Sequence, residues 1–323
     1  TEIYTLSLHD ALPISVLAAL DVEGRLFAAV EGEVVHLVRP GAFLGTSTRE
    51  GYLNPGGDGL WPAPEGSRLG YEYATGKWRV PPGLAGARYA VLRCTNRSLH
   101  IRAEIDLVNS EGLGLPTAFE RDIRLDGTTL TVTETIEYLG ARELAADRCR
   151  LAPWSLAQFH AAPGCVVHFP DAGPGTVRDL YDPSDNQRER AGEQWKTKTE
   201  GNARYQIALA PAVPWIELEN PHTGWRVRRT TAPLPAGQAH IDIADLPPDR
   251  EPDGAPVRFS VYNDAHGFLE LEAAGGTPGI LRPGDRLSLV ARTDFQPPRR
   301  CSPDGQARGC NSLAKCRALS SKA

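Results

Sequence analysis

The chain has 323 residues, with 35 Lys and Arg against 40 Asp and Glu, which gives a formal charge of −5. This mild acidity offers no electrostatic reason to expect nucleic acid or an anionic membrane surface as a partner. The sequence has no run of about 18 apolar residues, so we also expect no membrane-spanning segment. The 32 glycines and 27 prolines are too few for a low-complexity chain but many for a helical one. The composition predicts a globular, loop-rich protein with a full core.

The two ends of the chain do not read like the rest. Residues 1–15, TEIYTLSLHDALPIS, resemble translated sequencing-adapter DNA, and the chain contains no methionine. Residues 297–323 lack an apolar period and hold Cys301, Cys310 and Cys316 at spacings that fit no zinc site. We therefore predict a non-native leader at 1–15, one domain at 16–296 and a disordered or non-native tail at 297–323. The localisation cannot be read from such a chain.

From residue 16 onward the pattern is short β runs separated by turn residues. The clearest hairpin joins 119–125 to 129–138 around Asp126-Gly127, with Leu130 and Ile136 on one face of the second arm and threonines on the other. The other expected strands are 26–30, 34–38, 89–94, 101–108, 165–169, 205–210, 215–219, 225–230, 240–243, 257–262, 268–273 and 286–293.

Two long segments, 49–86 and 170–203, carry no such pattern, and we expect functional loops there. Helical periods are nearly absent, and no βαβ alternation, repeat or linker stands out. An all-β sandwich in a single domain is the expected fold. Isolated Cys94, Cys149 and Cys165 lie in or beside strand-like runs, where a cysteine is usually a small buried apolar residue.

The run 54–65, NPGGDGLWPAPE, is the most distinctive. Its paired glycines allow close backbone approach, and Trp61 offers a flat apolar face with one polar group. A sugar needs an aromatic platform together with fixed acceptors for its hydroxyls, such as Asp58. The alternative is a rigid turn with Trp61 in the core.

A second run, 151–160, places Trp154, Gln158 and His160 on one face of a strand. Together they would suit a polyol, although a lone histidine is more often structural. A third run, 268–272, places Glu270 and Glu272 on one face of a strand. Buried carboxylates without partners are costly, so either that face is solvated or one carboxylate works in a cleft.

In this order and spacing, the runs resemble the galactose mutarotase-like superfamily. The Gly-Gly…Trp-Pro segment at 56–62, the hairpin of 119–125 with 130–134, and the strand 268–272 followed by Leu281-Arg-Pro-Gly-Asp285 carry the resemblance, which covers nearly all of 20–295. The resemblance implies a large antiparallel β-supersandwich. The active enzymes of that superfamily interconvert the α and β anomers of aldoses, so the resemblance also implies this activity.

In those relatives a glutamate of the late strand is the general base, and histidines act as acid and binder. The resemblance carries the base to Glu272 or Glu270, two residues apart, and the acid to His160. The histidine-bearing pattern that follows the Gly-Gly loop in many relatives is absent from residues 70–80.

Two functions therefore stay open: an aldose 1-epimerase-like enzyme, and a carbohydrate-binding supersandwich without catalysis. The expected partner is a small carbohydrate, with no cofactor and no metal. The oligomeric state is unknown. If the sugar carries an anionic group, Arg121 or Lys198 could supply a local cation. The expected substrate-binding residues are Trp61, Asp58, Arg121, Trp154, Gln158 and Lys198.

Overall fold

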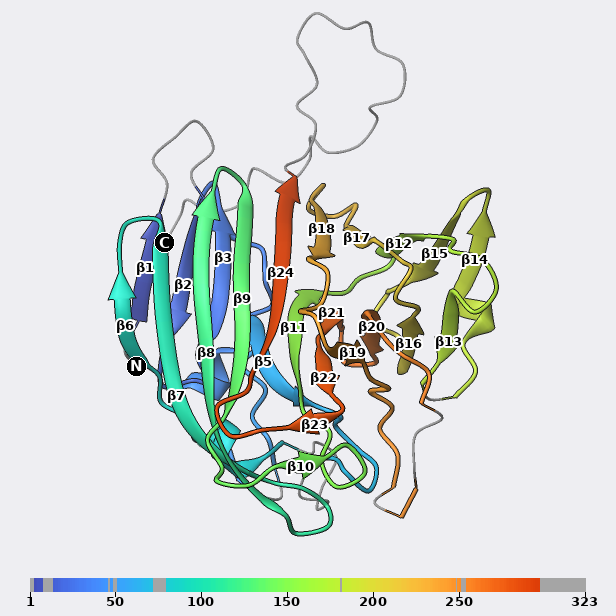
Figure 1. Ribbon diagram of the computed structural model, residues 1–323. Helices are drawn as coiled ribbons and strands as arrows, with labels where there is room; N and C mark the ends of the chain where they lie inside the picture. Colours follow the sequence, from blue (N-terminus) through green and yellow to red (C-terminus); the bar gives the residue numbers. More distant parts are fainter. Residues whose placement is uncertain are drawn as a thin grey trace, which may run out of the picture.

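The computed structural model describes residues 3–7, 14–45, 47–48, 51–71, 80–180, 182–247, 249–250 and 254–296. Within these residues the chain folds almost entirely into antiparallel strands, most of them in two ten-stranded sheets (Figure 1). The expected all-β antiparallel sandwich is confirmed. No helix in the described part of the chain is long and apolar enough to cross a membrane.

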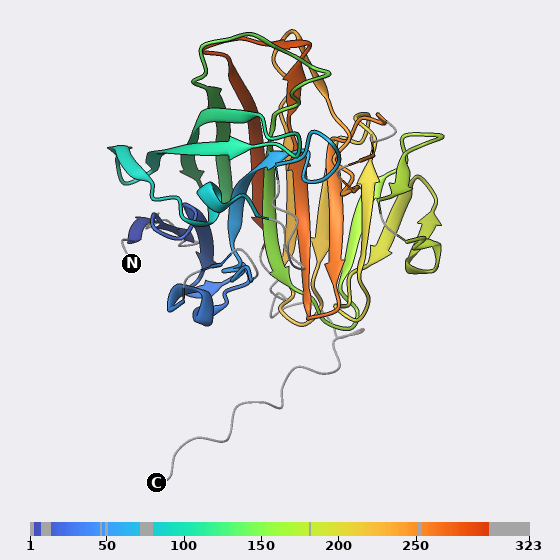
Figure 2. The same ribbon diagram turned by 90° about the horizontal axis from the view of Figure 1, so that it is seen from below.

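The first sheet carries the candidate site. In spatial order its strands are β1 (Ile3–Ser7), β2 (Ile14–Ala19), β3 (Arg25–Val30), β5 (Asp58–Ala63), β11 (Ala152–His160), β21 (Phe268–Ala274), β20 (Phe259–Asp264), β16 (Tyr205–Leu209) and β13 (Val177–Asp179), with β4 (Glu33–Val34) paired to β3. In Figure 2 the green strand β11 lies beside the orange strands β21 and β20.

The second sheet packs behind the first. In spatial order its strands are β14 (Arg188–Ala191), β15 (Gln194–Lys198), β12 (Val166–Pro170), β17 (Trp215–Glu219), β18 (Arg226–Thr231), β24 (Arg286–Gln296), β9 (Thr129–Tyr138), β8 (Gly114–Asp126), β7 (Ser98–Val108) and β6 (Ala90–Cys94). Two small sheets add β10 (Leu144–Ala145) with β23 (Ile280–Leu281), and β19 (Gln238–His240) with β22 (Gly276–Pro278). The short helices are η1 (Pro40–Phe43), α1 (Pro82–Ala85) and η2 (Asp185–Gln187).

The hairpin β8–β9 shows how the sequence pattern produces the sandwich. Its strands pair up to Asp126 and Thr129, so the two-residue loop is Gly127-Thr128, one residue later than the Asp-Gly turn we expected. Gly127 adopts a positive φ of 56°, which a hairpin loop of this length requires. The alternating apolar residues of β9 are buried against the first sheet, and strand β11 packs across the interface on β9 and β24.

The expectation of two long loops is wrong in part. Strand β5 occupies 58–63, inside the first segment, and β13, β14 and β15 lie inside the second. Pro62 of β5 is opposite Pro153 of β11, so the missing backbone donors of the two prolines face each other within the ladder. The glycines before β5 are structural: a Cβ at Gly57, where φ is 73°, would lie 2.7 Å from the carbonyl oxygen of Leu26.

The cysteine expectations meet a mixed result. Cys149 and Cys165 are buried, whereas Cys94 is exposed on β6, the outermost strand of the second sheet. The expectation of a buried Cys94 was wrong because an edge strand has a neighbour on one side only. Cys301, Cys310 and Cys316 lie outside the described residues.

Candidate active site

The register of the first sheet aligns polar side chains in rows across its outer face, the face directed away from the second sheet. Gln158 of β11 lies opposite Glu270 of β21, which lies opposite Tyr262 of β20. One row further along, Glu272 lies between Leu156 and Ser260. Because side chains alternate between faces, Glu270 and Glu272 project to the same side, as expected from the sequence.

Each of these glutamates is held by a glutamine from a different strand. Gln158 donates a hydrogen bond of 2.5 Å from Nε2 to Oε1 of Glu270. Gln206 of β16 reaches across β20 and donates to both carboxylate oxygens of Glu272, at 3.1 and 2.9 Å. Glu270 is 5% exposed and Glu272 only 1%, so the face that we thought might be solvated is closed to bulk water.

The two carboxyls behave as a pair that holds a proton. Burial raises the pKa of Glu270, while a hydrogen bond from Glu272 and the charge of Arg25 oppose that shift. Burial raises the pKa of Glu272 well above its usual value, and both the charge of Glu270 and the hydrogen bond between them add to this effect. Two like charges in one buried site are unfavourable together, so the pair favours the state in which the two carboxyls share one proton.

An aromatic and cationic group adjoins the pair on the same face. Trp61 of β5 lies opposite Trp154 of β11, and their rings meet edge to face at 6.3 Å. The guanidinium of Arg25 on β3 lies 5.9 Å from the centroid of Trp61 and donates to Glu23 at 2.9 Å and to Tyr52 at 2.9 Å. Together these contacts fix Arg25 in place.

The position of Arg25 depends on Gly59. Leu26 is opposite Asp58 in the ladder, so the neighbouring Arg25 lies beside Gly59, and a Cβ at Gly59 would lie 2.6 Å from Cζ of Arg25. The guanidinium therefore lies across the backbone of β5, in the space that a side chain would fill. From there its charge acts on Glu270.

Four buried polar atoms in this group have no hydrogen-bond partner among the described residues. Three are donors, namely Nη1 of Arg25 and Nε1 of Trp61 and Trp154, and the fourth is the acceptor Oε1 of Gln158. Buried polar groups are normally paired, so a cluster of unpaired ones calls for an explanation. A ligand with several hydroxyls would supply both the acceptors and the donor that they lack.

Two of the expected binding residues, Asp58 and Arg121, lie elsewhere. Both project between the sheets, where Arg121 binds Asp58 at 2.5 Å and Glu134 at 2.7 Å and Arg229 binds Asp58 at 3.0 Å. All four side chains are at most 1% exposed. A ligand on the outer face of the first sheet does not touch them, and their ion pairs instead join the two sheets.

His160 and Lys198 are not brought to the carboxyl pair either. His160 ends β11 opposite Phe268 and is exposed, with no hydrogen bond or ion pair to Glu270 or Glu272 among the described contacts. Lys198 is exposed at the end of β15 in the second sheet. Of the expected site residues, the structure therefore gathers Glu270, Glu272, Gln158, Trp61 and Trp154.

Sequence reasoning missed Arg25, Gln206 and Ser260. Ser260 and Gln206 sit in expected strands, but only the order β21-β20-β16 shows that they share a face with Glu272. Arg25 precedes an apolar run and looks like the start of a strand. No local signal marks any of the three.

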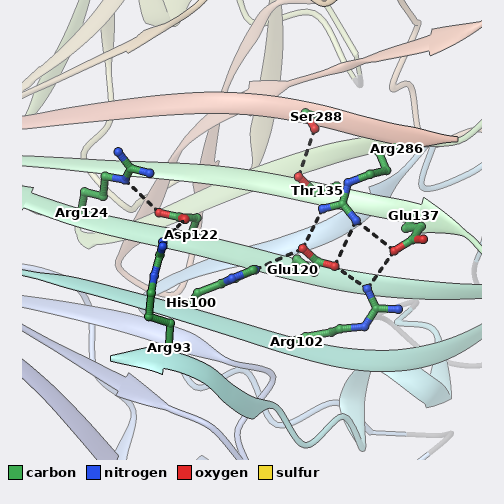
Figure 3. A network of polar contacts seen from close by, with 10 residues as sticks. All are labelled: Arg93, His100, Arg102, Glu120, Asp122, Arg124, Thr135, Glu137, Arg286 and Ser288. Carbon is green, nitrogen blue, oxygen red and sulfur yellow. Dashed lines mark hydrogen bonds and ion pairs between the residues drawn. The ribbon is translucent and has the colours of Figure 1, made fainter. Parts of the chain in front are cut away.

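A second polar network covers the opposite surface of the sandwich, on the outer face of the second sheet (Figure 3). Glu120 accepts hydrogen bonds from His100 at 3.1 Å and from Arg286 at 2.7 Å, and it also pairs with Arg102. These bonds, that of Arg286 first, lower the pKa of Glu120 to about 2. Because its charged groups already pair with one another, we interpret this network as surface ion pairs that stabilise the second sheet.

Comparison with known proteins gives the fold. No protein-family model and no curated protein matches the chain. Among solved structures, the Slr1438 protein of Synechocystis sp. PCC 6803 has a TM-score of 0.61 at 12% identity, over 92% of this chain and 96% of that one. A galactose mutarotase-like protein of Lactobacillus casei has a TM-score of 0.59 at 11% identity, over 91% of this chain and 100% of that one. A protein of Escherichia coli K12 that is described as an aldose 1-epimerase by assignment has a TM-score of 0.57 at 15% identity, over 92% of this chain and 99% of that one.

The chain is thus a single-domain antiparallel β-supersandwich. More narrowly, its fold is that of the galactose mutarotase-like proteins, as the sequence motifs indicated. At these identities the likeness extends to the fold alone.

Proposed function

We propose that the chain binds a carbohydrate on the outer face of the first sheet and interconverts the two anomers of an aldose. The observation that carries the proposal is the buried pair of Glu270 and Glu272, which lies on the same face as Trp61 and Trp154. Support also comes from the fold, which the chain shares with mutarotase-like proteins.

The reaction needs acid–base groups and no cofactor. A base takes the proton of the anomeric hydroxyl while an acid protonates the ring oxygen, and the bond between the anomeric carbon and the ring oxygen breaks. The open aldehyde turns about its bond to C2, and the same steps in reverse close the ring on the other face. A glutamate in a water-poor site is a stronger base than one in water, and burial raises the pKa of Glu270 in this way.

The aromatic group suits the sugar itself. The C–H face of a pyranose packs on an indole ring, while the free donors of Arg25, Trp61 and Trp154 suit its hydroxyl oxygens. The free Oε1 of Gln158 would accept from a hydroxyl next to Glu270. Hydrogen bonds of this kind position a polyol without requiring that it be charged.

The second candidate function is carbohydrate binding without catalysis. The observation in its favour is the position of His160, which the resemblance names as the acid but which does not contact the carboxyl pair. In that case the pair would only bind hydroxyls.

The test is the rate of mutarotation of a panel of freshly dissolved pure anomers, followed by polarimetry and by the anomeric proton signals in NMR. Buffer is kept dilute because mutarotation is also catalysed by buffer. We expect the protein to accelerate at least one aldose, and Glu270→Gln to lose the effect. Glu104→Gln, on the exposed outer face of the second sheet, is the matched control.

Calorimetric titration with the same sugars separates the two candidates. Binding without acceleration supports the second function and rules out the first. If neither binding nor acceleration occurs with any aldose, both are wrong.

A further inference from the structure

We propose that Glu23 sets the class of sugar that the site accepts. It balances the charge of Arg25 and leaves the guanidinium as a donor for a neutral hydroxyl, so the site binds neutral aldoses and rejects aldoses that carry a carboxylate or a phosphate. This inference rests on the proposed function and names the substrate class of the same site.

The hydrogen bonds of Arg25 leave one side of its guanidinium unused. Nε and Nη2 donate to Oε2 of Glu23 at 3.1 and 2.9 Å, and Nη2 also donates to the hydroxyl of Tyr52 at 2.9 Å. That hydroxyl donates in turn to Oε2 of Glu23 at 2.9 Å, which closes a ring of three residues. The three N–H groups of Nε and Nη2 thus have partners, whereas Nη1 has none among the described residues.

The unused Nη1 lies over the outer face of the first sheet. It is 2.6 Å from the position that a Cβ of Gly59 would occupy. Positions 59 and 61 of β5 point to the same face, so Nη1 lies on the side of the sheet that carries Trp61. Arg25 is 0% exposed. A buried donor without a partner is unfavourable, and a ligand on this face would supply the missing acceptor.

The strand register places this donor and the carboxyl pair at two ends of one row. Arg25 lies beside Gly59 of the neighbouring strand. Gly59 is opposite Leu156, which is opposite Glu272. Because neighbouring strands are about 4.8 Å apart, the Cα atoms of Arg25 and Glu272 are about 14 Å apart. Between them Gly59 has no side chain and Leu156 is apolar. A sugar ring on Leu156 can therefore meet the carboxyl pair at one end and Nη1 at the other.

The charge of Glu23 decides what the free donor can bind. Buried arginines elsewhere in this chain are also balanced, since Arg121 and Arg229 share two carboxylates between the sheets. Glu23 alone balances Arg25, and it is 4% exposed. An anionic group of a ligand would therefore be a second buried negative charge on one cation, which is costly. A hydroxyl oxygen accepts from Nη1 without adding any charge.

Two other arginines lie near this face, in rows beyond that of Arg25. Arg39 lies over the ring of Phe268 at 4.7 Å. Arg204 donates to the hydroxyl of Tyr262 at 3.2 Å. An anionic group at Nη1 lies in a different row from either of them. If a sugar instead placed an anionic group at these two arginines, the wild type would accept anionic aldoses, and a binding measurement would show it.

The first test compares sugars that differ only at C6. Calorimetric titration and mutarotation rates are measured with glucose, galactose and mannose, and with the uronate and the 6-phosphate of each. We expect the wild type to bind at least one neutral aldose, and to bind its uronate and its 6-phosphate at least about tenfold more weakly, because like charges in a buried site are unfavourable. A wild type that binds an anionic sugar as tightly as the neutral one overturns the inference.

Glu23→Gln separates the charge of this side chain from its shape. Glutamine has the same length, and its Oε1 can still accept from Arg25 and Tyr52, but the positive charge of Arg25 is no longer balanced. We expect the ratio of uronate affinity to neutral-sugar affinity to rise by about 10- to 100-fold. A purely structural role of Glu23 would weaken both affinities alike and leave this ratio unchanged.

Glu31→Gln is the matched control. Glu31 has a φ of 53°, close to the 56° of Glu23, and its side chain is exposed in the turn at the other end of β3. Its replacement should leave the affinity ratio within about threefold of the wild type.

Arg25→Gln tests the donor itself. It should weaken the binding of the neutral sugar by about 10- to 100-fold, as expected for the loss of a hydrogen bond from a charged group. Combined with Glu23→Gln, it should also abolish the gain in uronate affinity, because no unbalanced cation is then left.

The outcomes separate this inference from the proposed function. An affinity ratio that stays within about threefold in Glu23→Gln, or that rises equally in Glu31→Gln, overturns the inference and leaves the anomer exchange in place. If Glu23→Gln does not fold, the comparison of neutral and anionic sugars with the wild type decides. A wild type that binds neutral aldoses but accelerates none rules out the anomer exchange and leaves the inference standing. No binding of any sugar overturns both.

Discussion

Replacing Arg121 with glutamine is the sharpest test of how the two sheets are joined. The guanidinium donates to Glu134 at 3.0 and 2.7 Å, to the Asp58 carboxylate at 2.5 Å, and to two backbone carbonyls, those of Gly24 and Asp58, at 2.7 and 2.9 Å. A shorter, neutral glutamine cannot replace these bonds. Among the described residues, Asp58 would still pair with Arg229, whereas Glu134 would retain only a long contact of 3.5 Å with the hydroxyl of Ser155.

The magnitude follows from the stranded charge. Removing one partner of a buried ion pair costs about 3–5 kcal/mol, because the other charge stays in a low-dielectric interior. For a domain of this size, each kcal/mol lowers the melting temperature by roughly 2–4 °C. Arg121→Gln should therefore lower it by roughly 6–20 °C. Adding Glu134→Gln removes the stranded charge and should restore about 0.5–3 kcal/mol.

The assay is thermal and urea unfolding by circular dichroism of the wild type, the single variants and the double variant, with sugar titration of the folded proteins at low temperature. We expect a stability loss with unchanged sugar affinity. A variant that keeps its stability within about 0.5 kcal/mol but no longer binds sugar would refute the reasoning and return Arg121 to the binding site.

Two further predictions concern stability. Hydrogen bonds in the surface network lower the pKa of Glu120 to about 2, so its stabilising effect is complete above about pH 4.5 and is lost as the pH falls toward 2. We expect the free energies of unfolding in urea of wild type and Glu120→Gln to differ by about 1–2 kcal/mol at neutral pH and to converge at low pH. The difference is this small because Arg286 is half exposed, and solvent screens its charge. A constant difference would contradict the pairing. Gly57→Ala should cost about 1–3 kcal/mol beyond Gly192→Ala, because both glycines have positive φ but only Gly57 faces backbone within 3 Å. Equal losses in thermal melts would show that crowding plays no part.

The strands most accessible to prediction were those with one buried and one solvated face. Strand β9 begins and ends where the alternation of Leu130 to Tyr138 places it, because period two survives only when a single face is apolar. Strand β5 was missed for the opposite reason. It is buried on both faces, and Gly59 and Pro62 read locally as turn residues.

The candidate site was predictable only within single strands. The alternation of β21 correctly put Glu270 and Glu272 on one face, and that of β11 put Gln158 beside Trp154. We expected Asp58 at the ligand as an acceptor for sugar hydroxyls, and Arg121 as a cation for an anionic group. In the structure they lie on the inner faces of the two sheets and form an ion pair with each other. Which face of a strand turns inward depends on sheet order, which no local pattern encodes.

The absence of a side chain at Gly59 has a consequence for how this protein could change over evolution. Any larger residue there would displace the guanidinium of Arg25 from above β5 and with it the positive charge that acts on Glu270. A substitution two strands away from the carboxyl pair would thus alter the proton affinity of the pair without touching it. Position 59 is therefore restricted to glycine by the space that the charged guanidinium of Arg25 occupies.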